Sequence, residues 1–162
     1  MDPALQEIRR DRAIQSLVPL FLASGATSLI YEILWERQLH LLFGTSQIAV
    51  STVLAAFMTG LALGGWFGAR IADRTTRPLL VYAWLELGIG LYALIFPTLL
   101  GAITPLYLEF YRALTPGPWG FGVSQFALVA PLLLIPTTAM GMTLPLLARF
   151  ATRSHQEAGT QI

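Results

Sequence analysis

Four long apolar stretches limit this chain more than any other feature of its sequence. They run over Ile14–Trp35, Thr45–Ala69, Leu79–Leu100 and Phe121–Leu147. A helix that rises about 1.5 Å per residue needs about 20 apolar residues to cross about 30 Å of hydrocarbon, and each stretch meets that length. The sequence therefore predicts an all-α integral membrane bundle of four transmembrane helices, with the lipid bilayer as its first partner.

The distribution of positive charge predicts an orientation. All ten basic residues are arginines, although the formal net charge is only +1. Eight of them precede the first stretch, fill the link between the second and third, or follow the fourth: Arg9, Arg10, Arg12, Arg70, Arg74, Arg77, Arg149 and Arg153. Only Arg37 and Arg112 lie in the other two links. Because cytoplasmic loops are enriched in arginine, we expect an inner (plasma) membrane protein with cytoplasmic tails over 1–13 and 151–162 and a membrane domain over 14–150.

The four tryptophans agree with these boundaries. Trp35, Trp66, Trp84 and Trp119 all fall near the ends of the predicted spans. An indole favours the headgroup layer because its ring is apolar and its N–H is polar. We therefore expect these side chains at the membrane–water interfaces.

The sequence lacks the residues that several kinds of catalysis and metal binding require. Without cysteine there is no disulfide, thiolate nucleophile or cysteine-ligated metal. His40 and His155 fall on opposite predicted sides, so they cannot form a metal pair. We find no Ser/His/Asp set and no phosphate-binding loop, and we expect a non-catalytic protein with no cofactor, no metal and no nucleic-acid partner.

The second stretch carries the most regular pattern. Small residues recur every four positions on one helical face: Thr52, Ala56, Gly60, Gly64 and Gly68. Such spacing lets two helix backbones approach closely in a membrane, where packing drives association. The pattern predicts helix packing along Ala56, Gly60, Gly64 and Gly68, and leaves open whether the partner helix belongs to this chain.

The link over residues 101–120 is long for a helical bundle and rich in aromatic residues. These are Tyr107, Phe110, Tyr111 and Trp119. We expect Pro97 to end or kink the third span, because proline removes a backbone donor. We also expect Pro105–Leu114 to form a short amphipathic helix at the outer surface.

The fourth stretch contains three prolines, Pro131, Pro136 and Pro145. Each one frees a backbone carbonyl one turn earlier, since the proline nitrogen has no hydrogen to donate. In lipid these carbonyls need a new donor from a neighbouring helix, a Ser or Thr hydroxyl, or water.

The link between the second and third stretches holds the most specific local motif, Gly68, Asp73, Arg74 and Arg77. A glycine, Asp-Arg and a further basic residue in this order resemble the loop between the second and third helices of major facilitator superfamily transporters. In that family the acidic and basic residues latch two helix bundles in one state of the transport cycle. The sequence departs at Thr76, where the family usually has glycine. The alternative is a basic loop that sets topology, in which Asp73 neutralises an arginine.

Other segments extend this resemblance over nearly the whole chain. They resemble the membrane region of bacterial proteins that fuse a major-facilitator-like part to a spermidine-synthase-like domain: Leu29–Trp35, Phe43–Ser46, Ser51–Gly64, Leu85–Ala93 and Met140–Arg149. The resemblance implies a major facilitator-like half bundle. No glycine-rich strand–helix turn with a downstream acidic residue is present for an adenosyl cofactor, so synthase activity is not expected.

Glu86 is the strongest single candidate for a functional residue. It lies about two turns inside the third span, where a carboxylate is costly and marks a functional site by default. One hypothesis is a proton or cation site. The other is a structural carboxyl that hydrogen-bonds to a neighbouring helix.

Glu32 and Glu36 lie one turn apart at the end of the first span. Like charges at this spacing repel, so one of them is a candidate to bind a proton, a cation or Arg37. The alternative is a solvated pair at the membrane interface. Together with Glu86 they form our candidate solute or proton site.

Two functions fit these observations. The first is a transporter-like module that binds or moves a small cationic solute such as a polyamine, together with a second copy or another membrane subunit, because four helices do not supply two rocking bundles. The polyamine comes from the resemblance alone. The second is an accessory or anchoring subunit of a larger membrane complex. A small four-helix multidrug antiporter fits less well, since its carboxylate lies deep in the first helix and Glu32 lies at the end.

Overall fold

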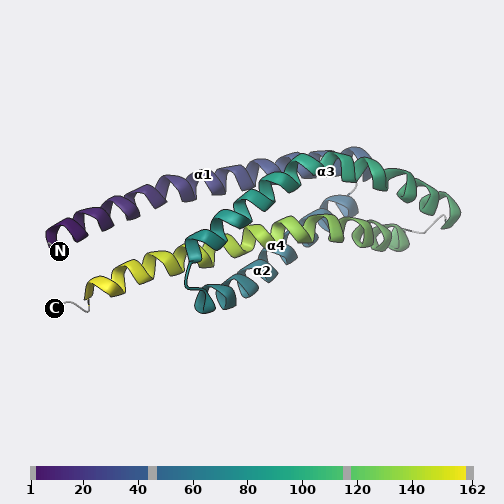
Figure 1. Ribbon diagram of the computed structural model, residues 1–162. Coiled ribbons are helices and arrows are strands. Elements are labelled where there is room, and N and C mark those ends of the chain that lie inside the picture. Colours follow the sequence, from purple (N-terminus) through teal and green to yellow (C-terminus); the bar gives the residue numbers. More distant parts are fainter. Residues whose placement is uncertain (1–2, 44–46, 115–117, 160–162) are drawn as a thin grey trace.

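A computed structural model shows an all-helical chain with four long helices (Figure 1). They are α1 (Pro3–Phe43), α2 (Gln47–Arg74), α3 (Pro78–Leu114) and α4 (Pro118–Gly159). The structure describes residues 3–43, 47–114 and 118–159. Within them it describes the side chains of residues 19–42, 47–109, 112, 120 and 123–152.

Three helices are long and apolar enough to cross a membrane. Within the described residues these segments are Gln47–Arg74, Pro78–Glu109 and Val123–Thr152. They correspond to the second, third and fourth predicted spans, which this result confirms in length and composition. The predicted first span, Ile14–Trp35, begins among residues whose side chains lie outside the described part, and it stays a prediction.

The helices run back and forth along one long axis (Figure 1). The start of α1 and the end of α4 lie at one end of the molecule, and the link between α2 and α3 lies on the same side, partway along these two helices. The end of α1, the start of α2, the end of α3 and the start of α4 lie toward the other end. We call these the terminal end and the far end.

The close pairing of α2 with α4 is the basis of the fold. A Cβ atom added at Gly64 would lie 2.7 Å from the Cα of Gly141, and one at Gly68 would lie 2.7 Å from the Cα of Met142. A Cβ at Gly60 would overlap the side chain of Thr137. The small-residue face of α2 therefore lies directly on the α4 backbone, so its partner helix is part of this chain.

The largest group of buried apolar side chains draws on all four helices. It includes Trp35 and Leu39 of α1, Phe96 of α3 and Leu133 of α4, each at most 3% exposed. A second, smaller group near the terminal end consists of Ala72, Tyr82, Leu146 and Leu147. Most remaining large apolar side chains are exposed, as expected for helices whose solvent is lipid.

The third helix differs from its predicted boundary. It continues unbroken through Pro97 and Pro105 to Leu114, so the separate surface helix expected over Pro105–Leu114 is wrong. A proline removes only its own backbone hydrogen bond, and the turns on either side hold the helix together. The hydroxyl of Thr104 also donates to the carbonyl of Leu100, 2.7 Å away, beside the second proline.

Candidate functional site

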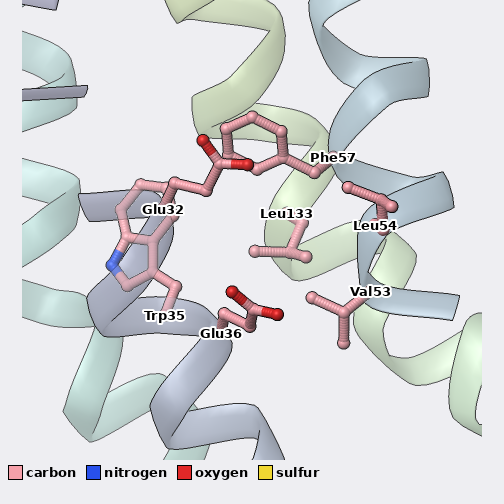
Figure 2. Close-up of a pocket in the computed structure, with 7 residues that line it drawn as sticks. All are labelled: Glu32, Trp35, Glu36, Val53, Leu54, Phe57 and Leu133. Atoms are coloured by element: carbon pink, nitrogen blue, oxygen red, sulfur yellow. The ribbon is translucent and has the colours of Figure 1, made fainter. Parts of the chain in front are cut away.

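A small pocket lies where α1 meets the α2–α4 pair (Figure 2). Its wall is apolar except for two carboxylates, and its lining residues are Glu32, Trp35, Glu36, Val53, Leu54, Phe57 and Leu133. Figure 2 shows that both carboxylates point from α1 toward α2 and α4. Its volume of about 30 Å³ holds one or two groups the size of a water molecule. We call this space the acidic pocket.

The electrostatics of the acidic pocket depend on a third titratable residue. The Nε2 atom of His40 lies 3.8 Å from an Oε1 atom of Glu36, one turn further along α1. This nitrogen is buried and has no hydrogen-bond partner among the described residues. Glu36 thus faces His40, while the carboxyl group of Glu32 lies beside the ring of Phe57. A positive group in the pocket would relieve the repulsion between the two carboxylates.

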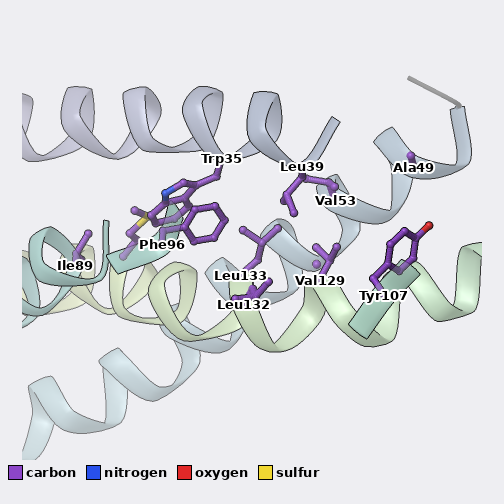
Figure 3. Close-up of a cluster of buried hydrophobic side chains, with 12 residues drawn as sticks. Trp35, Leu39, Ala49, Val53, Ile89, Phe96, Tyr107, Val129, Leu132 and Leu133 are labelled. Atoms are coloured by element: carbon purple, nitrogen blue, oxygen red, sulfur yellow. The ribbon is translucent and has the colours of Figure 1, made fainter. Parts of the chain in front are cut away.

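Aromatic rings fix the part of α1 that carries the acidic pocket. The indole of Trp35 stacks on Phe96 at 5.0 Å and on Tyr31 at 5.7 Å between ring centroids. It meets Tyr92 edge-on at 6.2 Å. Trp35 is only 3% exposed and lies in the core (Figure 3), so its expected place at the interface is wrong. Its large apolar surface packs better between α1 and α3 than at a helix end.

Glu86 lies elsewhere in the molecule. It is partly buried on α3, and the hydroxyl of Ser24 on α1 donates to its Oε1 atom at 2.5 Å. Ser24 precedes Glu32 by eight residues, or about 12 Å along a helix axis. The structure therefore brings Glu32 and Glu36 together and leaves Glu86 in a separate site.

The predicted motif at the terminal end is mostly helical. Asp73 and Arg74 belong to the last turn of α2, and Gly68 lies inside it. In the short link that follows, the backbone N–H of Arg77 donates to the Thr75 hydroxyl at 3.3 Å. Asp73, Arg74 and Arg77 are exposed, and Asp73 lines a shallow groove between α2 and α4 with Arg149.

Sequence reasoning missed three polar side chains. Ser24 was hidden in a cluster of small residues, and His40 was considered only as a metal ligand. Gln125 is fully buried on α4, and within the described part of the chain neither end of its amide has a hydrogen-bond partner. A lone glutamine in an apolar stretch is a signal that the sequence does provide.

In the part of the chain that the structure describes, no three His, Asp or Glu side chains are grouped to hold a metal ion. Comparison with protein-family models, curated proteins and solved structures finds no match to this chain. The fold defines a class, a helical protein with three helices that are long and apolar enough to span a membrane. The suspected relation to fused major-facilitator and spermidine-synthase-like proteins stays a prediction.

Proposed function

We propose that this chain is a non-catalytic, transporter-like membrane module that binds a small organic cation in the acidic pocket. The observation that carries the proposal is the pair of carboxylates, Glu32 and Glu36, in a pocket that is otherwise apolar. Two like charges one turn apart repel each other. An ammonium group would pair with both carboxylates at once, which makes it the best ligand for the acidic pocket.

The size of the acidic pocket limits what enters it. About 30 Å³ accepts one ammonium head and not a whole metabolite. A linear amine would place its head between the carboxylates and its apolar chain along Val53, Leu54 and Phe57. This arrangement suits a polyamine, the solute class implied by the sequence resemblance.

A partner bundle is part of the proposal. Transporters of the facilitator type rock two bundles about a site near the middle of the membrane. The acidic pocket lies between α1 and the α2–α4 pair, and α1 touches the other helices only lightly. A second copy or another membrane subunit would complete the assembly in the inner membrane, with both termini in the cytoplasm.

Calorimetric titration of the purified chain in lipid nanodiscs with spermidine tests the proposal. We expect saturable binding whose Kd rises about tenfold or more in Glu36→Gln, because the variant removes one of the two carboxylate charges that would hold the cation. Glu109→Gln, which removes an exposed carboxylate from α3, is the matched control and should bind like the parent. Equal affinity in all three proteins would contradict the assignment of the pocket.

The accessory-subunit hypothesis is the second candidate. It is favoured by the tight α2–α4 pair, which provides a rigid body for other subunits to pack against. If the parent chain binds no spermidine, this hypothesis takes the place of the transporter-like one. Foreign subunits that co-purify stoichiometrically in mild detergent would then identify the complex.

A further inference from the structure

The site around Glu86 consists of three oxygen-bearing side chains from two helices. Ser24 of α1 donates to Glu86 of α3, and Tyr82 lies one turn before Glu86 on the same helix. Tyr82 is 3% exposed, and among the described residues its buried hydroxyl makes no hydrogen bond of good geometry. The same hydroxyl lies within interaction range of the Ser24 hydroxyl and the Glu86 carboxylate. These residues form a polar cluster inside the helical bundle.

The unused donor of Tyr82 is the most informative feature of the cluster. A buried hydroxyl without a well-aligned partner is costly, and a small rotation toward a nearby acceptor would remove this cost. Its neighbours can supply that partner. Ser24 uses its only hydrogen on Glu86, and the lone pairs of its oxygen and the second carboxylate oxygen remain as acceptors.

We propose that Glu86, Ser24 and Tyr82 form an intramembrane proton-binding site. Serine and tyrosine hydroxyls both donate and accept hydrogen bonds. When Glu86 is ionised, its oxygens accept from Ser24 and, after a small rotation, from Tyr82. When Glu86 takes up a proton from water, its own O–H donates to one of these hydroxyl oxygens. The cluster therefore stays hydrogen-bonded in both protonation states.

The surroundings leave Glu86 as the group that changes charge. On its own helix Tyr82 is the neighbouring titratable residue, and on α1 the contact is the neutral hydroxyl of Ser24. The nearest described carboxylate on α1 is Glu32, about 12 Å further along that helix. The proton site is therefore independent of the acidic pocket, and one proposal can fail without the other.

Infrared difference spectroscopy of the chain in nanodiscs tests the proton site directly. On acidification the carboxyl groups of the chain give protonated-carboxyl bands, recognised by their shift in D₂O, and we expect one component that is present in the parent and in Glu109→Gln and lost in Glu86→Gln. Identical difference spectra for the parent and Glu86→Gln would overturn the proposal. The readout needs no transport activity, so it does not depend on spermidine binding.

Two further variants separate a proton site from a merely structural contact. Ser24→Ala removes the donor to the ionised carboxylate and should move the titration midpoint by about one pH unit. Tyr82→Phe removes the second hydroxyl and should also move the midpoint. If both variants fold and titrate at the parent midpoint, the three residues do not act together, and the assignment of Ser24 and Tyr82 is wrong.

Discussion

The hydroxyl of Tyr92 takes the place of a backbone donor that Pro136 removes. Pro136 has no N–H to give to the carbonyl of Leu132, one turn earlier in α4. Tyr92 of α3 donates to that same carbonyl at 2.8 Å. The carbonyl that lost its donor within α4 thus accepts a hydrogen bond from α3. In a membrane such a carbonyl needs a protein donor, because no water is present to replace it.

A double-mutant cycle on this pair should reveal their coupling. Tyr92→Phe leaves the carbonyl of Leu132 without a donor and should destabilise the protein by about 1 kcal/mol. In the Pro136→Ala background the restored N–H can bond to Leu132, so the same change should cost less. Reversible unfolding in detergent mixtures measures both values. Equal costs in the two backgrounds would show that the hydroxyl does not replace the lost donor.

Among the helices, α2 and α4 form the rigid element and α1 the loosely attached one. The α2–α4 contact is made by backbone atoms, which cannot rotate away from an added side chain. The contact of α1 uses side chains instead, namely the Trp35 ring, the Ser24 hydroxyl and the carboxylates of the acidic pocket. Both candidate sites therefore lie against the helix that contacts the rest of the bundle least.

Two adjacent glycines give a matched test of the rigid pair. Gly64→Ala would place a Cβ against the Thr138 carbonyl and the Gly141 backbone, and should cost about 1–3 kcal/mol as the helices move apart. Gly65→Ala meets no atom within 4 Å and should be neutral or slightly stabilising, because alanine favours a helix. Thermal unfolding of both variants measures the difference. Similar stabilities would contradict the close packing on α4.

In the whole molecule, the four helices run back and forth, so that α4 ends on the side of the molecule where α1 begins (Figure 1). Arg74 ends α2 and Arg77 precedes α3, and the link between these helices lies on the side of this terminal end. Most arginines of the sequence belong to segments at the same end. If the helices cross a bilayer, this end is the one that the positive charge assigns to the cytoplasm.

Accessibility of single cysteines tests this orientation. The natural chain contains no cysteine, so Ser154→Cys and Thr115→Cys each introduce a unique thiol. On intact cells a membrane-impermeant maleimide should label Thr115→Cys and spare Ser154→Cys, and both should react after the cells are opened. The reverse pattern would refute the predicted orientation. Labelling of both positions on intact cells would show that the C-terminal tail is not cytoplasmic.

The helical class of the structure and several of its contacts follow from the amino-acid pattern alone. Apolar length alone located three spans, because a bilayer demands about 20 apolar residues whatever their partners. The spacing of Gly60, Gly64 and Gly68 marked the face of α2 that lies against another helix, since backbones approach closely only where side chains are small. Glu32, Glu36 and Glu86 stood out because charge is rare in such segments.

Only the tertiary structure decided which of these residues meet. Neighbours such as Ser24 and Glu86 are 62 positions apart, and no local pattern encodes that distance. The burial of Trp35 and the continuation of α3 through Pro97 likewise depend on packing against other helices, which overrides the preference of a single residue. The sequence provides the carboxylates, whereas the packing of α1 divides them between an acidic pocket and a separate polar cluster.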